Sequence, residues 1–316
     1  MKYIKYLYML PVIASGMFLT GCDDDDEVVD VPYVPQTEIG ARLLANSDAV
    51  ARIYTDTTFV VGLGVTETDI HFLKADGYST HAFIIDIDMN NPNVSVEVAM
   101  PYDTDVKSNF NLQTLTDMAE YADRPFHRVV AMVNADFWDT GNMDIRGPLH
   151  RNGNILKDTF IPKASLPQQA LSFIAVTKDN HMVIRDSVDY RPMMYNLKEV
   201  TGAGVVVLRE GVISGQSYPG TDPRTCVGYS NDGHVYFLVV DGRGSATFYS
   251  WGINYPHMGS IMQGLGCAWA ANLDGGGSTQ MLIRHPIANA FQIRNRPTDG
   301  AERPVVNGWM VTVKEP

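Results

Sequence analysis

A glycine triplet with polar neighbours, near the C-terminal end of the chain, has the composition of a site that acts on a bound anion. It reads NLDGGGSTQM over residues 272–281, between the apolar runs CAWA and MLI. Consecutive glycines can adopt positive φ and turn several backbone N–H groups towards one point, which suits a negatively charged ligand. Asp274 could orient a hydroxyl or accept a proton there, and Ser278 and Gln280 could line the far side. An ordinary hairpin turn, with Asp274 as a turn residue, also explains the triplet, and taken alone it is the preferred interpretation.

A second polar cluster, VVAMVNADFWDTGNMDIRGPLHRNGNI over residues 129–155, begins as an apolar strand. Polar residues that directly follow such a strand lie at its mouth, which is a common position for ligand-binding groups. The candidates here are Asn134, Asp136 and Arg146. A long surface loop rich in turn-forming residues, with Arg146 paired to an acid, explains the same pattern.

Two arginines lie near the ends of a third segment, DPRTCVGYSNDGHVYFLVVDGR, over residues 222–243. A hairpin in this segment would bring Arg224 and Arg243 to the same end of a sheet, beside Asp241. Because guanidinium groups bind phosphate with fixed, two-pronged geometry, this pair could clamp a phosphate. A structural pair of arginine and aspartate at the hairpin mouth is an equally good interpretation.

A fourth segment, NRPTDGAERPVVNGWM over residues 295–310, packs Arg296, Asp299, Glu302 and Arg303 among prolines and glycines before a last apolar strand. For most of these residues, a closing loop tied by ion pairs is the interpretation that the pattern favours.

The elements that must position these side chains are mostly strands. Runs rich in β-branched and aromatic residues predict strands, several of them joined by the turn pairs Asn152-Gly153, Asp179-Asn180 and Asp232-Gly233. Helical periodicity is confined to residues 111–124 and 260–267. We therefore predict an α+β fold, with a mostly antiparallel or mixed β-sheet core and a few helices, forming one domain over residues 41–316. The predicted strands are 58–68, 81–89, 94–100, 128–137, 171–177, 181–186, 204–213, 225–230 and 234–242.

The N-terminal stretch is expected to be a targeting signal followed by a tether, rather than part of the folded domain. Residues 1–21 contain two lysines followed by an apolar run, as in a signal peptide, and Leu19 to Cys22 resembles the lipobox of bacterial lipoproteins. The resemblance implies a lipid at Cys22 and a membrane anchor. Residues 22–40 combine acidic residues and proline, which indicates a flexible tether and resembles an acidic surface-export signal. An outer-membrane lipoprotein, periplasmic or exposed on the cell surface, is the expectation; a plain secretory signal and an N-terminal anchor helix are the alternatives.

The net charge bears on the ligands that the protein can bind, and the cysteine content bears on whether it contains a disulfide. The formal net charge of −12 over 316 residues argues against non-specific binding of nucleic acid, which requires clustered Lys and Arg. With Cys22 lipidated, Cys226 and Cys267 remain. Two buried free thiols are favoured over a disulfide, because a domain of this size does not need a covalent link.

The four segments together resemble one family, the phosphodiester glycosidases. The matching stretches are VNADFWD with GPLHRNGNI, DPRTCVGYSNDG with VVDGR, NLDGGGSTQM, and NRPTDGAERPVVNG. The resemblance implies hydrolysis of a sugar-1-phosphodiester, with a carbohydrate or sugar phosphate as the substrate. Asp136 stands where many members carry a glycine, which changes size and charge at the strand mouth.

The chemistry of such a reaction assigns roles to the candidates. Arg224 and Arg243 would bind phosphate with the N–H groups of the triplet, and Asp274, helped by Asp241 or Asp136, would be the general base or nucleophile. When two carboxylates lie close together, repulsion raises the pKa of one of them. One group can then act as the acid and the other as the base. The full set of expected binding residues is Asn134, Arg146, Arg224, Arg243, Gly275, Gly276, Gly277, Ser278, Gln280 and Arg303.

Two matters stay open at this level. The carboxylates could hold a divalent metal ion such as Ca²⁺ or Mg²⁺, although no spacing matches a known calcium loop. The chain could also be a surface glycan-binding protein without catalysis, using aromatic residues to stack on sugars, or a hydrolase of glycans that carry no phosphate. The aromatic candidates are Trp138, Trp251, Trp269 and Tyr255.

Overall fold

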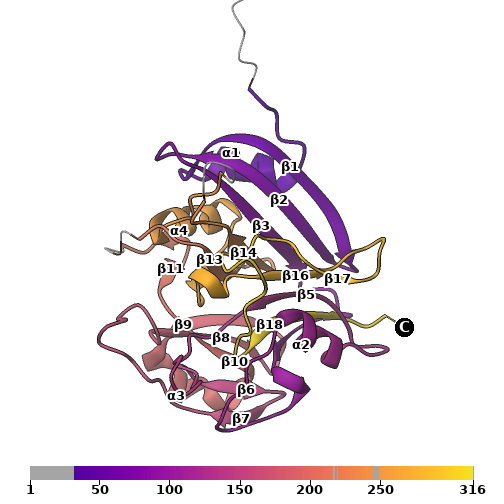
Figure 1. Cartoon of the computed structure of the whole chain (residues 1–316), viewed down its shortest axis with the longest axis vertical. Coiled ribbons are helices and arrows are strands. Elements are labelled where there is room, and N and C mark those ends of the chain that lie inside the picture. The colour runs from indigo at the N-terminus through magenta and orange to yellow at the C-terminus, as the bar shows by residue number, and fades with distance from the viewer. Residues whose placement is uncertain (1–31, 216–217, 219, 245–248, 316) are drawn as a thin grey trace, which may run out of the picture. The chain divides into compact units, whose positions relative to one another are not determined.

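The computed structural model describes residues 32–215, 218, 220–244 and 249–315 (Figure 1). The signal, lipobox and acidic run expected at the N-terminus lie outside these residues. Residues 33–316 form one compact unit, to which all the following contacts belong. Within the described residues, no helix is long and apolar enough to span a bilayer.

The strands form three sheets in the described part of the chain, and their pairings are antiparallel. The first sheet has the order β1-β2-β3-β14-β13-β15-β11-β12, the second β7-β6-β10-β8-β9, and the third β17-β16-β5-β18-β4. Figure 1 shows β1 to β3 at one end of the unit, the second sheet at the other, and β5 and β16 between them.

The strand bounds follow. In the first sheet they are β1 Val50–Gly62, β2 Val65–Lys74, β3 Ser79–Asp88, β11 Val206–Arg209, β12 Val212–Ile213, β13 Arg224–Tyr229, β14 His234–Val240 and β15 Trp269–Asn272. In the second they are β6 Leu149–Arg151, β7 Asn154–Lys157, β8 Ser172–Thr177, β9 Met182–Asp186 and β10 Leu197–Ala203. In the third they are β4 Val94–Ala99, β5 Arg128–Asn134, β16 Met281–Arg284, β17 Phe291–Ile293 and β18 Gly308–Val313.

Helices cover the outer faces of the sheets. Helices α1, Glu38–Asn46, and α4, Tyr255–Gly264, pack on the first sheet; α2, Leu115–Ala122, packs on the third; and α3, Tyr190–Met193, packs on the second. Each of the longer helices begins at a polar cap whose side chain accepts a backbone N–H: Thr37, Thr114 and Asn254. Short 3₁₀ turns occur at Pro101–Asp103, Ser187–Asp189, Met194–Asn196 and Gly276–Ser278.

One apolar core joins the inner faces of the three sheets. Phe237 from the first sheet, Ile174 from the second and Trp309 from the third belong to it and are buried completely. The indole N–H of Trp309 also donates to the Thr201 hydroxyl at 2.9 Å, so β18 and β10 are joined across the core. Burial of this large apolar surface is what holds the sheets in register with one another.

The predicted fold class and the predicted turn pairs are confirmed. The chain is α+β with a mainly β core, and Asn152-Gly153, Asp179-Asn180 and Asp232-Gly233 join consecutive strands. The helix predicted over 111–124 is shorter, and the one predicted over 260–267 begins earlier, at Tyr255.

Other predictions need correction. Residues 58–68 and 204–213 are hairpins rather than single strands, because positive φ at Gly64 and at Glu210-Gly211 reverses the chain. The compact unit that contains the predicted domain also includes residues 33–40. Asp56 attaches this segment, because its carboxylate accepts the Tyr33 hydroxyl and the Gln36 and Thr37 N–H groups. Cys226 and Cys267 are buried free thiols, as favoured.

Substituting Trp309→Phe should lower the free energy of unfolding by about 1 to 3 kcal/mol, because it removes buried volume and leaves the Thr201 hydroxyl without its donor. Urea denaturation measures the change. The exposed Trp251→Phe is the matched control and should change stability by less than about 0.5 kcal/mol. Equal effects of the two substitutions would contradict the account of the core.

Candidate functional site

The glycine triplet crosses between two sheets. It follows β15 of the first sheet and leads into β16 of the third, with Gly276–Ser278 forming a 3₁₀ turn. The two flanking strands do not pair with each other, so the triplet is not a hairpin turn. Only Gly276 of the three has positive φ, at 61°. The alternative of an ordinary hairpin turn is therefore wrong.

Each glycine of the triplet faces a different arginine. A Cβ atom added at Gly275 would lie 3.7 Å from the Arg224 side chain, one at Gly276 would lie 3.0 Å from Nη2 of Arg243, and one at Gly277 would overlap the Arg303 guanidinium. The missing side chains therefore let three cationic groups approach one turn of backbone. This convergence brings together residues that are up to 79 positions apart, from Arg224 to Arg303.

The backbone N–H groups of the triplet are used differently from the prediction. The Gly275 N–H donates to Oδ1 of Asp274 at 2.9 Å, and the Gly276 N–H donates to the Pro223 carbonyl at 2.9 Å. Two of the three N–H groups expected to hold an anion are thus occupied within the protein. Positive charge at this place comes from the arginine side chains.

Asp274 is a partly buried carboxylate among these cations. Desolvation raises its pKa to about 6, although hydrogen bonds from Ser278 and from the Gly275 N–H, and the charges of Arg303 and Arg224, act in the opposite direction. A carboxyl group with this pKa exchanges protons near neutral pH, which suits a general base or a nucleophile.

Arg224 and Arg243 lie at the same end of the β13-β14 hairpin, as predicted, and share one partner that the sequence argument missed. Asp222 accepts from Nε and Nη2 of Arg243 at 3.3 and 3.2 Å, and lies 3.6 Å from Nη2 of Arg224. Arg224 also lies 4.4 Å from the ring centre of Tyr255 and donates to its hydroxyl at 3.1 Å. The structural interpretation of the pair is thus confirmed by the contacts with Asp222, and the phosphate clamp stays a prediction.

Asn134 and Gln280 hold the backbone of the triplet. The Asn134 side chain donates to the Asp274 carbonyl at 2.7 Å and accepts from the Thr225 hydroxyl at 2.7 Å and from the Gln280 N–H at 3.1 Å. The Gln280 side chain donates to the Arg303 carbonyl at 2.9 Å. Both side chains are buried, so these interactions position the site.

Asp136 is buried behind the triplet. Its Oδ2 accepts the N–H groups of Gly147 and Gly202, each at 3.1 Å, while Oδ1 is buried without a hydrogen-bond partner. Desolvation raises its pKa to about 7, against the opposing charge of Lys157, and repulsion from Asp274 adds to the increase. Asp136 and Asp274 are therefore an interacting carboxyl pair.

Asp241 belongs to a neighbouring network. Its carboxylate accepts the Asn295 side chain at 3.1 Å and the Arg296 N–H at 3.0 Å, and desolvation raises its pKa to about 6. Asn295 in turn donates to the Thr279 carbonyl at 3.0 Å, next to the triplet. Asp69, which the sequence argument missed, also raises the pKa of Asp241.

Other candidates have separate roles. Arg146 pairs with Asp139 at 2.6 Å, as its alternative interpretation predicted, and Arg303 pairs with Asp299 at 2.6 Å while donating to the Ser278 hydroxyl at 3.4 Å. Within the described residues, no three or more His, Cys, Asp or Glu side chains are arranged to hold a metal ion.

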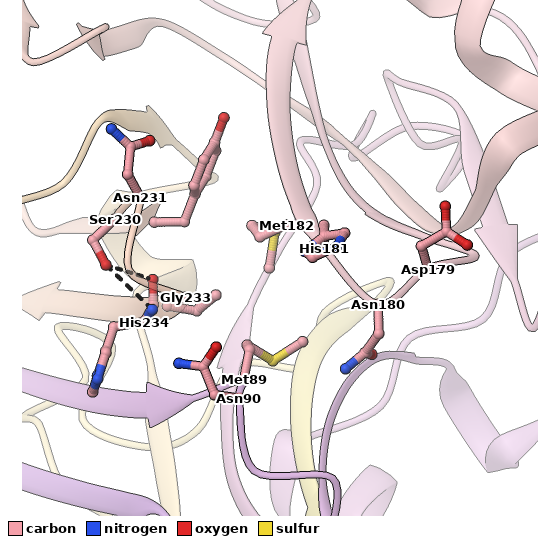
Figure 2. Close-up of a pocket in the computed structure, with 12 residues that line it drawn as sticks. Met89, Asn90, Asp179, Asn180, His181, Met182, Ser230, Asn231, Gly233 and His234 are labelled. Carbon is pink, nitrogen blue, oxygen red and sulfur yellow. Dashed lines mark hydrogen bonds between the residues drawn. The ribbon is translucent and has the colours of Figure 1, made fainter.

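A hollow lies at the opposite end of the β13-β14 hairpin, about 17 Å along the strand. It has a volume of about 280 Å³. Figure 2 shows that three turns line it, contributing Asn90, Asn180 and Asn231, with Asp179 and His181 at one side. Its lining contains no Lys or Arg, so it lacks the cations that a phosphodiester requires.

A sequence model of the phosphodiester glycosidases matches residues 127–312, which is more than half of the chain and includes Asp136, Asp241, Asp274 and all four candidate arginines. The chain belongs to the phosphodiester glycosidase family. A curated relative, an uncharacterized protein derived from the SPbeta prophage of Bacillus subtilis, is 36% identical over 85 residues. This match covers 27% of the present chain and 12% of the relative's length.

Solved structures share the fold of this phosphodiester glycosidase family member at low identity. The zebrafish N-acetylglucosamine-1-phosphodiester α-N-acetylglucosaminidase catalytic domain, auto-inhibited by its pro-peptide, has a TM-score of 0.60 at 15% identity, covering 83% of this chain and 88% of that one. A hypothetical protein from Synechocystis has a TM-score of 0.56 at 15% identity, covering 79% and 62%. A putative exported protein from Burkholderia pseudomallei has a TM-score of 0.57 at 11% identity, covering 89% and 99%.

Substituting Asp136→Asn should make the stability of this family member less sensitive to pH. Because the pKa of Asp136 rises from 3.8 to about 7 on folding, the carboxyl favours the folded state less as pH rises through this interval. The effect on wild-type unfolding free energy is up to about 4 kcal/mol. Chemical denaturation between pH 4 and 8 measures the slope, with exposed Asp179→Asn as control. A slope equal to the wild type's would contradict the raised pKa.

Proposed function

We propose that the protein hydrolyses a glycosyl phosphodiester, a sugar-1-phosphodiester, in a glycan or glycoconjugate outside the cytoplasm. One observation carries the proposal: Asp274, a carboxyl group with a pKa of about 6, lies at a backbone turn against which three arginines pack. A phosphodiester brings one negative charge, and a working carboxyl group must lie next to it. Family membership and the zebrafish glycosidase of similar fold support the same reaction class.

The arginines would bind and orient the phosphate. Arg224 is held by Tyr255 and by the Gly220 carbonyl at 3.1 Å, so its position is fixed before a ligand arrives. Arg243 is half-exposed and tied to Asp222, which keeps it beside Arg224. Fixed guanidinium groups stabilise developing charge on phosphate without reorganising during the reaction.

Asp274 would act as the general base or the nucleophile. It is the carboxyl group that contacts the glycine turn directly, and Arg303 and Arg224 favour its ionised form. The ionised carboxylate could accept a proton from water or attack the sugar carbon; both roles require loss of its own proton first.

Asp136 and Asp241 would act through neighbours. Asp136 is almost inaccessible, so it would hold the Gly147 and Gly202 backbone through its carboxylate without touching substrate. Asp241 would position the Asn295-Arg296 segment next to Thr279. Both are therefore positioning residues in this proposal, rather than groups that attack the substrate.

The N-terminal motifs support a location for this reaction. Leu19 to Cys22 resembles a lipobox, and five acidic residues follow at once. A lipid at Cys22 would anchor the domain to the outer membrane, on its periplasmic or external side, where glycans are the abundant substrates.

Substituting Asp274→Asn should lower kcat/KM for a sugar-1-phosphodiester by at least about 100-fold, because the amide cannot accept a proton or attack. A screen of α- and β-linked sugar-1-phosphodiesters, together with phosphate-free glycans, identifies the substrate. Asp179→Asn, in the hollow of Figure 2, is the control and should keep wild-type rates. Undiminished turnover by Asp274→Asn would overturn the assignment. Turnover of phosphate-free glycans alone, or glycan binding without turnover, would replace the proposed function.

The pH profile of kcat/KM should fall on the acid side of about 6, where Asp274 takes up its proton. Asp136 has the higher pKa, about 7, so it is mainly protonated where Asp274 titrates; the neutral substitution Asp136→Asn should therefore leave the acid limb close to its wild-type position. Steady-state kinetics between pH 4 and 8 compare the two profiles. A clear displacement of the acid limb in the variant would contradict this order of ionisation.

A further inference from the structure

Three large aromatic side chains lie exposed together on the first sheet. The exposed fractions are 53% for Tyr78, 59% for Tyr249 and 45% for Trp251. The ring centres of Tyr78 and Trp251 are 5.6 Å apart with the rings tilted by 56°, so the two form one surface. We call these residues the aromatic rim. Exposed apolar side chains that gather in this way commonly mark a binding surface.

The backbone of the aromatic rim is held in place. The Trp251 N–H donates to the Ser79 carbonyl at 3.2 Å, and the Ser79 hydroxyl donates to the Tyr249 carbonyl at 2.9 Å. The Lys74 ammonium lies 5.7 Å from the centre of the Tyr78 ring. These contacts hold the backbone that carries the rings before any ligand arrives, which lowers the entropic cost of binding.

The aromatic rim continues directly into the arginine site. Gly252, which follows Trp251, is so close to Asp222 that an added Cβ would lie 2.6 Å from the Asp222 carbonyl oxygen. Ile253 and Asp222 exchange backbone hydrogen bonds at 3.0 and 3.3 Å. Asp222 is the residue that holds both Arg224 and Arg243. The aromatic rim and the two arginines are therefore joined through one residue, Asp222.

Two of the other aromatic candidates, Trp269 and Tyr255, are covered by arginine side chains. Trp269 lies under the Arg185 guanidinium, which is 4.3 Å from its ring centre, and Tyr255 is buried beneath Arg224. The chain has four tryptophans, all in its described part, and Trp251 alone is exposed. The position of Trp251 thus distinguishes it from the three others.

We infer that Tyr78 and Trp251 bind a pyranose ring of the substrate adjoining the phosphodiester, so that the enzyme selects phosphodiesters embedded in an oligosaccharide. This inference rests on the proposed function. The two faces of a pyranose ring carry C–H groups that pack on aromatic rings, while its hydroxyl groups remain in water. The phosphate would bind to the arginines, and the aromatic rim would bind the sugar that is attached to the phosphate.

The test compares a short substrate, a methyl sugar-1-phosphodiester, with one that carries a trisaccharide on the other side of the phosphate. The ratio of kcat/KM for the long substrate to that for the short one should fall about 3- to 10-fold in Trp251→Ala and in Tyr78→Ala. Trp251→Phe should keep most of the ratio, because phenylalanine still stacks. Tyr121→Ala is the matched control: Tyr121 is 57% exposed and pairs with Tyr102 at 5.5 Å, but lies in α2 on the third sheet.

A second measurement does not depend on turnover. Titration with a phosphate-free trisaccharide should change the tryptophan fluorescence of the wild type and of Tyr121→Ala, but not that of Trp251→Phe, which lacks the exposed indole. Unchanged kinetic ratios in both alanine variants would overturn the inference while leaving the hydrolase assignment intact. If the wild type cleaves neither substrate, the proposed function fails, and the fluorescence titration alone decides whether the rim binds sugar.

Discussion

The site depends on the absence of three Cβ atoms at consecutive positions. Without side chains at Gly275 to Gly277, three guanidinium groups can pack on one turn of backbone. Like charges at this spacing repel, and the fold offsets the repulsion with Asp222 and Asp299. The arginines are thereby held near one another, although Asp222 is shared between two of them. Asp274 supplies the third negative charge when its carboxyl group is ionised, because Arg303 and Arg224 act on it directly.

The raised pKa values of the aspartates in the site follow from their burial. Asp136, Asp241 and Asp274 all have pKa values raised by desolvation, to between about 6 and about 7, but their surroundings differ. Asp274 alone lies against the cationic turn, while the other two are enclosed by hydrogen-bond donors from neighbouring segments. Position relative to the arginines, more than pKa, separates the working carboxylate from those that support it.

The sequence predicted the components of the site better than their arrangement. Strand patterns placed Arg224 and Arg243 at one hairpin end, because register follows from a tight turn. Two facts could not be predicted from the sequence: that the triplet crosses between sheets, and that two of its three N–H groups donate to acceptors within the protein. Both depend on packing between residues far apart in the chain, such as Asn134 with Thr225. The role of Asp222 was also missed, because an aspartate before a proline looks like any turn residue.

The connection from β15 to β16 determines the stage of folding at which the site can form. Asp274 and Gly277 lie on the only stretch that passes from β15 to β16, and their partners come from two sheets and from the segment before β18. No smaller part of the fold contains the arrangement, so it exists only once the sheets have docked on their common core. Long-range pairings of this kind form late in folding. An unfolded chain would thus carry every residue of the site and none of its chemistry.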